Sequence, residues 1–277
     1  MEHVEAGGAR IPKLGLGTWQ NTGPGCAETV RTALEVGYRH VDTAQIYDNE
    51  REVGDGIAAA DVDRESVFLT TKVWRSNLRR EDVHESVRAS LDRLGVEYVD
   101  LLLIHWPHPR VPVGETLAAM ADLREEGLVD HLGVSNFTRS QLRAAREAVD
   151  APIVTDQVQY HPYKDQSALR DYCLGADVAL TAYSPLARGD ALSGDLLVDI
   201  GAGYDKSPAQ VALRWLVQQD GVIAIPKASS RDHLAENLAV FDFSLTESEM
   251  ARIDAHSGGL GRRVRNLLPT LLRRLPV

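Results

Sequence analysis

Residues able to donate or accept protons stand at the ends of short apolar runs in this sequence. Asp42, Lys72 and His105 each follow such a run directly, and Tyr47 lies shortly after Asp42. A carboxylate, an ammonium, an imidazole and a phenol are groups that enzymes use for acid–base catalysis. Burying a lysine with a carboxylate removes both charges from water, a cost that their attraction repays only in good geometry. We therefore interpret Asp42 and Lys72 as a functional pair rather than a structural ion pair.

Other apolar runs also end in polar or aromatic side chains. The polar ones are Ser135, Asn136, Gln157, Tyr183, Ser184 and Lys227. Three tryptophans, Trp19, Trp74 and Trp106, fall at the same kind of position. Small-molecule sites are concave and mostly apolar, with a few convergent polar groups. The pattern therefore predicts an aromatic-walled pocket beside the proton-transfer residues.

Eight short β-rich runs carry these residues, and amphipathic helical stretches separate them. The runs read LGLGTW, RHVDTA, VFLTTKVW, VDLLLIHW, DHLGVSN, IVTDQVQY, VALTAYSP and GVIAIPK. Strands that are apolar throughout are typical of parallel sheets covered on both faces. The alternation predicts an α/β fold, and its eight repeats favour a closed (β/α)8 TIM barrel over an open doubly wound sheet. In such a barrel the carboxyl ends of the strands meet on one face, which would gather these residues.

We expect a single barrel domain over residues 1–277, with an N-terminal hairpin at 1–12 and a C-terminal tail at 257–277. Before the tail, the stretch TESEMARIDAH predicts an extra helix. The tail is rich in arginine and leucine and is broken by Pro269 and Pro276. We expect it on the surface, and weak association with a membrane surface stays open.

Two helix starts carry recognisable capping patterns. Ser207 followed by Pro208 predicts an N-cap and a proline in the first helical position. Asn49 and Glu52 are spaced as an N-cap and an N3 residue, which resembles a capping box. We therefore expect helices to begin at both places.

The composition of the chain indicates which classes of binding partner are not expected. The 277 residues carry a formal net charge of −10, with 44% hydrophobic and 25% charged residues, which is ordinary for a globular chain. A negative surface repels phosphate backbones, so nucleic acid is not expected as a partner. No apolar run approaches the roughly 20 residues that span a bilayer, and the acidic start has no signal-peptide core. We expect a cytoplasmic monomer.

Several familiar motifs are absent, which leaves more than one chemistry open. Gly15-Leu16-Gly17 is followed by Gln20 where the dinucleotide fingerprint needs glycine, and no P-loop occurs. The histidines lack the spacing of a helical zinc pair, and two cysteines are too few for a sulfur-ligated zinc site. A barrel aldolase that forms a Schiff base through Lys72 or Lys227 remains an alternative. A metal-dependent hydrolase remains another.

Taken together, the segments resemble the aldo-keto reductase family across nearly the whole chain. The blocks are LGLGTW, HVDTAQIYDNE, LTTKVW, LLLIHWP, GVSNF, DQVQYHP, AYSPL and IPKASS…LAEN, in the family's order and with its spacing. The resemblance implies a (β/α)8 barrel that binds NAD(P)H without a Rossmann motif. It also implies reduction of a carbonyl by hydride transfer. A non-catalytic NADP(H)-binding barrel subunit is a further alternative.

By this resemblance, Asp42, Tyr47, Lys72 and His105 match the family's catalytic tetrad. Tyr47 would protonate the oxygen of the reduced carbonyl as general acid. Tyrosine is a weak acid, and we expect the Lys72 ammonium, held by Asp42, to lower its pKa. His105 would donate a hydrogen bond to the carbonyl oxygen and orient it.

The resemblance also implies the cofactor contacts. Ser135, Asn136 and Gln157 match positions that bind the nicotinamide carboxamide, and Tyr183 matches the ring that stacks on it. Further along the cofactor, the matching positions are Ser184, Leu186 and Asp190 at the pyrophosphate, Lys227 at the adenosine 2′-phosphate, and Glu236 and Asn237 at the adenine.

This sequence departs from the family pattern at three places. Ala228 follows Lys227 where a serine is common, His233 replaces an arginine near the phosphate, with Arg231 able to reach in, and Asp156 replaces an asparagine. We therefore expect a preference for NADP(H) with the discrimination against NAD(H) left open. The substrate-binding tryptophans, Trp19, Trp74 and Trp106, predict an apolar pocket for aldehydes or small ketones. No metal is expected.

Overall fold

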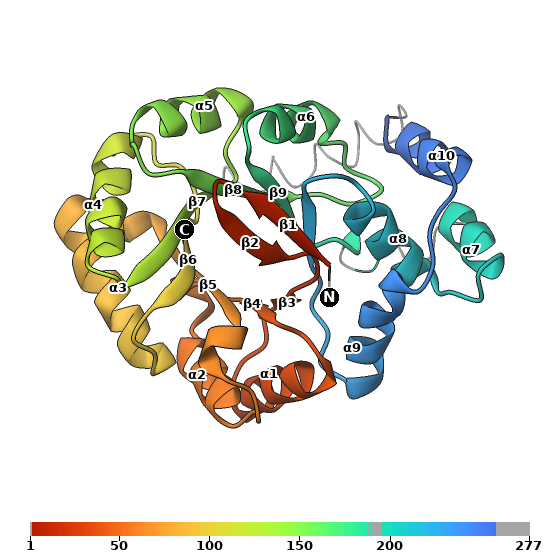
Figure 1. Cartoon of the computed structure of the whole chain (residues 1–277), viewed down its shortest axis with the longest axis horizontal. Coiled ribbons are helices and arrows are strands. Elements are labelled where there is room, and N and C mark those ends of the chain that lie inside the picture. The colour runs from red at the N-terminus through yellow and green to blue at the C-terminus, as the bar shows by residue number, and fades with distance from the viewer. Residues whose placement is uncertain (1, 188, 190–194, 259–277) are drawn as a thin grey trace, which may run out of the picture.

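Eight parallel strands form the centre of the computed structural model, which describes residues 2–187, 189 and 195–258 (Figure 1). The strands lie in the order β10-β9-β8-β7-β6-β5-β4-β3, so each pairs with its neighbour in sequence. Their bounds are β3 (Leu16–Gly17), β4 (His40–Asp42), β5 (Phe68–Val73), β6 (Val99–Ile104), β7 (Val129–Ser135), β8 (Ile153–Gln159), β9 (Ala179–Tyr183) and β10 (Val222–Ile225). Every expected run therefore contains a strand.

Hydrogen bonds between the first and last strands close the sheet into a barrel. The N–H of Ala224 donates to the carbonyl of Lys13, and the N–H of Gly15 donates back to the carbonyl of Ala224. Gly17 donates to the carbonyl of Pro226. A Cβ on Gly17 would lie 2.8 Å from the carbonyl oxygen of Ile225, so this close approach requires glycine. The (β/α)8 prediction is confirmed, and the sheet is not an open one.

Helices surround the strands, as Figure 1 shows. They are α1 (Pro24–Val36), α2 (Glu50–Ala58), α3 (Arg80–Leu94), α4 (Val113–Glu125), α5 (Arg139–Glu147), α6 (Ser167–Gly175), α7 (Asp195–Ala202), α8 (Pro208–Val217), α9 (Arg231–Leu238) and α10 (Glu247–Gly258). Short 3-10 turns include η1 (Gln45–Tyr47), directly after β4. The larger hydrophobic core lies between the strands and these helices. This packing makes a rigid frame for the strand ends.

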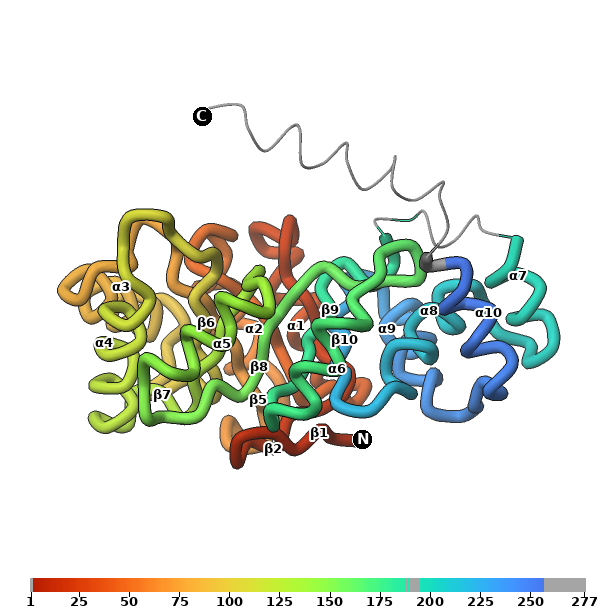
Figure 2. The backbone as a smooth tube through the Cα atoms, turned by 90° about the horizontal axis from the view of Figure 1, so that it is seen from above, coloured from red at the N-terminus to blue at the C-terminus, as the bar shows by residue number. Residues whose placement is uncertain are grey.

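A hairpin covers the amino ends of the barrel strands. It consists of β1 (His3–Ala6) and β2 (Ala9–Pro12), which pair antiparallel. A second hydrophobic cluster joins Ile11 of the hairpin to Phe68, Leu101 and Ile223, residues near the starts of three strands. Figure 2 shows the hairpin on one side of the barrel strands. The opposite mouth, where the strands end, is therefore the one left for a site.

Helices begin at both predicted places, but only the Ser207 side chain forms the capping box. Ser207 accepts from the N–H of Gln210 in a full capping box, and Pro208 opens α8. Asn49 precedes α2 but makes no side-chain cap. Its amide instead donates to the carbonyls of Thr18 and Asn21, because its side chain lies toward the loops at the mouth of the barrel. Residues 257–258 of the expected tail belong to α10, and the rest of that tail lies outside the described residues.

Candidate active site

Tyr47 is placed by a short turn that follows β4. The turn η1 ends at Asp48, whose φ of 53° is left-handed and breaks the helical path. Asn49 then fixes the loop, since its Oδ1 accepts from the Thr43 hydroxyl at 2.7 Å. The Tyr47 phenol thus follows β4 in a loop that the hydrogen bonds of Asn49 hold in place.

Asp42, Lys72 and Tyr47 form a continuous chain of hydrogen bonds. The Lys72 ammonium, on β5, donates to Oδ1 of Asp42 at 2.5 Å and to the carbonyl of Thr43 at 2.7 Å. It also donates to the Tyr47 hydroxyl at 3.5 Å. The side chains of Lys72 and Asp42 are 0% and 2% exposed. Adjacent strands β4 and β5 therefore bring together the pair expected from the sequence.

Burial sets the ionisation of this chain. It lowers the pKa of Lys72, while the neighbouring carboxylates of Asp42 and Glu50 act in the opposite direction. Burial also raises the pKa of Tyr47 well above its ordinary value, and the negative charge of Asp42 adds to that rise. Burial and Asp42 therefore oppose the lowering of the Tyr47 pKa that we expect from Lys72, and that expectation stays a prediction. The ammonium is engaged by Asp42 and Thr43, and Tyr47 is a protonated phenol at neutral pH.

His105 lies beside Tyr47 as a neutral imidazole. Burial lowers the pKa of His105 to about 3, and the positive charge of Lys72 contributes. The edges of its ring meet Tyr47 and Trp74, with centroids 5.6 and 5.1 Å apart. Its Nδ1 is enclosed without a hydrogen-bond partner among the described residues. A neutral imidazole donates from one ring nitrogen only, and a proton on Nε2 makes that atom the donor.

Gln157, on β8, reaches across the barrel to Asp42. Its Nε2 donates to Oδ2 of Asp42 at 2.7 Å, and the two side chains are almost fully buried. Because Asp42 accepts only, this bond assigns the amide nitrogen to the Asp42 side. The amide oxygen of Gln157 then remains as an acceptor. Asp42 thus connects the hydrogen-bonded chain of Lys72 and Tyr47 to one of the expected carboxamide-binding residues.

A second polar network joins the ends of β7 and β9. The Ser135 hydroxyl donates to the carbonyl of Gln157 at 2.8 Å, and Asn136 donates to the carbonyl of His105 at 3.1 Å. The Tyr183 hydroxyl donates to Oδ1 of Asn136 at 2.8 Å. Asn136 has a φ of 64°, a left-handed backbone that is concentrated at functional sites. The expected nicotinamide residues are therefore neighbours in space.

A cavity of about 330 Å³, here called the reaction pocket, opens at this mouth of the barrel. Its apolar wall contains Trp19, Ile46, Trp74 and Trp106, which brings the three expected tryptophans together. The polar residues on its wall are Asp42, Tyr47, His105, Ser135, Asn136, Gln157, Tyr183, Ser184 and Lys227. Lys72 lies beneath this wall, fully buried. The volume is within the range of small-molecule sites.

Some of the expected cofactor residues lie away from this wall. Leu186 packs against the hydrophobic core, and α9 carries both Glu236, which is exposed, and Asn237, which is 5% exposed. Lys227 lies at the rim, where its ammonium donates to the carbonyl of Gln20 at 3.0 Å. Asp190 lies outside the described residues. The structure thus gathers the residues expected at the nicotinamide more tightly than those expected at the adenosine.

The structure adds supporting residues that the sequence analysis did not single out. Gln45 accepts from the N–H of Trp74 at 2.8 Å and so fixes the start of that tryptophan's loop. Glu50 is buried and accepts from Thr71 at 2.6 Å and from the guanidinium of Arg93. Gln45 and Glu50 flank Tyr47 in the block HVDTAQIYDNE. The high density of polar residues in this block is the sequence feature that could have indicated their supporting role.

Neither a metal-binding cluster nor a membrane-spanning helix occurs in the described part of the chain. No group of three or more histidine, cysteine or acidic side chains there could hold a metal ion. None of the helices in residues 2–187 and 195–258 is long and apolar enough to cross a bilayer.

Comparison with known proteins identifies the family. The Aldo/keto reductase family matches residues 13–257. A 9,11-endoperoxide prostaglandin H2 reductase of Trypanosoma cruzi is 43% identical over 249 residues, covering 88% of this chain and 87% of its own. The glyoxal reductase of Bacillus subtilis is 39% identical over 249 residues, covering 90% of each chain. The chain therefore belongs to the aldo/keto reductase family of oxidoreductases.

Solved structures agree with this assignment. The aldose reductase from Schistosoma japonicum superimposes with a TM-score of 0.89 at 34% identity, over 93% of this chain and 92% of that one. An aldo-keto reductase from Bombyx mori in complex with NADP gives a TM-score of 0.85 at 34% identity, over 92% of each. The barrel is therefore shared with enzymes of this family.

Proposed function

We propose that this protein reduces aldehydes or small ketones to alcohols with NADPH, and that Tyr47 is the general acid. The observation that carries this proposal is the hydrogen-bonded chain Asp42–Lys72–Tyr47, which ends beside His105 on the wall of the reaction pocket. A phenol, an imidazole and a lysine ammonium lie together at or just beneath this point of the pocket wall. These groups can stabilise and protonate the negatively charged oxygen that forms as a carbonyl is reduced.

Tyr47 holds the proton at Oη, and its high pKa keeps the proton there until the carbonyl oxygen becomes basic. Lys72, which does not line the reaction pocket, donates to Oη, so the phenolate that forms after proton transfer gains an ammonium neighbour. Nε2 of His105 donates to the carbonyl oxygen and orients it. The three tryptophans line the pocket and would contact the apolar substituents of the carbonyl compound.

The residues on the pocket wall fit a nicotinamide cofactor, which when bound supplies the hydride. The free amide oxygen of Gln157 matches a carboxamide N–H donor, because its nitrogen is committed to Asp42. Asn136 and Ser135 add further polar atoms at the same place, and the Tyr183 ring is held by Asn136. A relative from Bombyx mori contains NADP, which supports the same cofactor here.

Lys227 is the residue that we propose binds the adenosine 2′-phosphate and so favours NADPH over NADH. Its ammonium is exposed at the rim and is bound only to a neutral carbonyl in the described structure. Lys227→Ala should raise the KM for NADPH at least tenfold more than the KM for NADH, since one lost charge-assisted bond is worth about 1.5–3 kcal/mol. Lys206→Ala, on the loop before α8, is the matched control. Equal increases for both cofactors would remove Lys227 from this role.

The proposed activity is tested by incubating the protein with NADPH and a panel of aldehydes, ketones and sugars. We expect oxidation of NADPH with one alcohol formed for each NADPH consumed. Binding of NADPH without turnover of any carbonyl would indicate the non-catalytic alternative. The aldolase alternative predicts a borohydride-trapped lysine; against it, the Lys72 ammonium is fully buried and bonded to Asp42. Inactivation by a chelator would instead favour a metal-dependent hydrolase.

A further inference from the structure

Glu50 is a buried carboxylate that does not contact the groups of the proposed proton transfer. It opens α2, shortly after Tyr47, and is 2% exposed. Its Oε1 accepts from the Thr71 hydroxyl at 2.6 Å, and its Oε2 accepts from two nitrogens of Arg93 at 2.9 and 2.6 Å. Burying a carboxylate costs free energy unless partners satisfy it, and here both oxygens are bonded. These are the bonds of an ionised carboxylate.

Thr71 brings this carboxylate close to Lys72. The two residues are neighbours on β5, and neighbouring side chains of a strand point to opposite faces. The Lys72 ammonium bonds to Asp42 in the barrel interior, so Glu50 lies on the other side of β5, which faces the helices. The strand backbone separates the two groups. Glu50 therefore acts on Lys72 through its charge.

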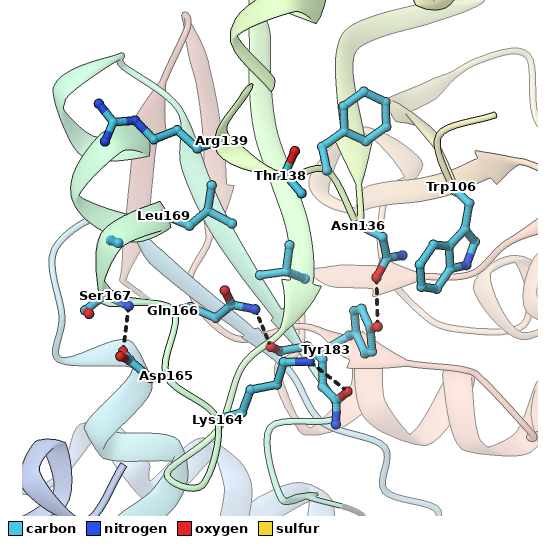
Figure 3. A pocket seen from close by; sticks show the side chains of 14 residues that line it. Trp106, Asn136, Thr138, Arg139, Lys164, Asp165, Gln166, Ser167, Leu169 and Tyr183 are labelled. Atoms are coloured by element: carbon cyan, nitrogen blue, oxygen red, sulfur yellow. Dashed lines mark hydrogen bonds between the residues drawn. The ribbon is translucent and has the colours of Figure 1, made fainter. Parts of the chain in front are cut away.

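Several ionisable groups face the Lys72 ammonium from the elements around it. They are His40 and Asp42 of β4, Tyr47 of η1, Glu50 of α2, His105 after β6 and Tyr183 of β9. Burial lowers the pKa of His40 to about 4 and that of His105 to about 3, which favours their neutral forms. The Tyr183 hydroxyl donates to Asn136, as Figure 3 shows. Burial also lowers the pKa of Lys72, and the carboxylates of Asp42 and Glu50 oppose this.

Arg93 does not cancel the charge of Glu50 at Lys72, because the two partners differ in exposure. The side chain of Arg93 is 40% exposed and that of Glu50 is 1% exposed. Arg93 also lines a cavity of about 520 Å³, which Asp82 and Glu85 share. Water screens a charge at the surface far more than a charge in the interior. The field of the pair at Lys72 is therefore dominated by the carboxylate.

We propose that Glu50 and Arg93 are positioning residues of the reaction: Glu50 keeps the Lys72 ammonium charged from across β5, and Arg93 holds Glu50 in place. The kinetic part of this inference rests on the proposed carbonyl reduction. A charged Lys72 stabilises the phenolate that Tyr47 becomes when it gives up its proton. Loss of the Glu50 charge should therefore make the reaction fail at a lower pH.

A purely structural role for the pair makes a different prediction. Arg93 donates to the Ser90 hydroxyl at 3.1 Å, and Gln45 donates to the same hydroxyl at 3.3 Å. Gln45 begins η1, the turn that carries Tyr47. If the network served only to hold that turn, a change at Glu50 would lower activity at every pH and leave the titration of Lys72 unmoved.

The direct test is NMR of the protein labelled with 13C at the lysine Cε atoms, without cofactor. Glu50→Gln, which retains an acceptor for Thr71, should lower the pH at which Lys72 titrates by about one unit, the lower end of the effect of a nearby charge. Arg93→Gln should raise that pH, and Arg93→Lys, which keeps the charge, should leave it close to the wild-type value. The Lys72 signal is assigned by elimination, with single substitutions of the other lysines: Lys13→Arg, Lys164→Arg, Lys206→Arg and Lys227→Arg.

The matched controls are Glu52→Gln on α2 and Arg88→Gln on α3, whose partner Glu126 lies at the surface. Neither should move the titration of Lys72. Kinetics with saturating NADPH and an aldehyde then give the consequence for the reaction. The pH above which kcat/KM falls should move down by about one unit in Glu50→Gln and up in Arg93→Gln. A common loss of stability cannot produce shifts of opposite sign.

The outcomes separate this inference from the function on which it rests. An unmoved Lys72 titration in Glu50→Gln, or shifts of the same sign in the two variants, overturns the proposal. Glu50→Gln decides alone if Arg93→Gln does not fold. A titration that moves while the pH profile of kcat/KM does not also overturns the proposal, and carbonyl reduction stands. If the wild-type protein reduces no carbonyl compound, the proposed function fails and the positioning role fails with it.

Discussion

Two buried aspartates at the same mouth of the barrel have opposite surroundings. Asp42, on β4, receives Lys72 on one carboxylate oxygen and Gln157 on the other. Asp156, on β8, is 0% exposed; one of its oxygens accepts from the N–H of Phe137 at 3.4 Å. The other has no hydrogen-bond partner among the described residues. The same residue type is thus fully paired in one region and nearly alone in the other.

The difference shows what allows a buried carboxyl group to stay ionised. Burial raises the pKa of Asp156 well above its ordinary value, which favours its neutral form. It also contributes to the raised pKa of Cys173, about 12, after the effect of burial itself. Asp42 instead lies against an ammonium, and an ion pair with satisfied hydrogen bonds can persist in the interior. Burial alone therefore does not distinguish the two aspartates. The hydrogen-bond partners of Asp42 are what point to a functional role for it.

The largest expected effect comes from removing the charge of the paired aspartate. Asp42→Asn leaves the Lys72 ammonium buried without its carboxylate, which should cost about 3–5 kcal/mol of unfolding free energy. We also expect kcat to fall roughly 10²–10⁴-fold, because Lys72 would lose its charge or its position beside Tyr47. Denaturant unfolding and steady-state kinetics measure the two effects. Full activity in this variant would show that Lys72 needs no counterion. The pairing of Asp42 would then not distinguish it functionally from Asp156.

Asp156→Asn should act in the opposite direction and depend on pH. The folded pKa of Asp156 is raised above the unfolded value, so its contribution to stability is present at low pH and is lost as pH rises toward the folded pKa. Asparagine does not titrate. The stability of the variant relative to wild type should therefore increase as the pH rises above about 4, by at most about 1.4 kcal/mol per pH unit.

Thermal unfolding at several pH values measures this difference. A relative stability that stays constant with pH would mean that Asp156 is ionised in the folded protein, with a partner that the described residues do not provide. That result would make the two aspartates alike.

Gln157 offers the smallest of these effects and links the two regions, since it follows Asp156 in sequence and contacts Asp42. Gln157→Leu removes the bond to Asp42 and the acceptor proposed for the carboxamide. A lost hydrogen bond is worth about 0.5–1.5 kcal/mol, so we expect cofactor affinity to weaken several-fold to about tenfold. Fluorescence titration with NADPH measures it. Unchanged affinity would place the carboxamide elsewhere.

Much of this arrangement could be predicted from the sequence because it depends on periodicity. Each apolar run formed a strand, and the residues after β4, β5 and β6 met at one mouth because parallel strands all end on the same side. The gathering of Asp42, Lys72 and His105 follows from that rule alone.

The contacts across the barrel could not be predicted in the same way. The bond between Gln157 and Asp42 joins β8 to β4, and it depends on strand register and closure that no local pattern encodes. Asn49 matched a capping pattern, but the loops at the mouth compete for its amide. The pKa of Tyr47 depends on how deeply its loop is buried, which the sequence does not give.

The central claim is that the proton comes from the hydroxyl of Tyr47, and Tyr47→Phe removes only that group. In single-turnover experiments with NADPH and a reactive aldehyde, we expect the rate of cofactor oxidation to fall roughly 10²–10⁴-fold. The dissociation constant for NADPH should stay close to that of the wild type, because the expected cofactor contacts lie on other strands. A rate that remains near that of the wild type, or a loss of NADPH binding equal to the loss of rate, would contradict the account.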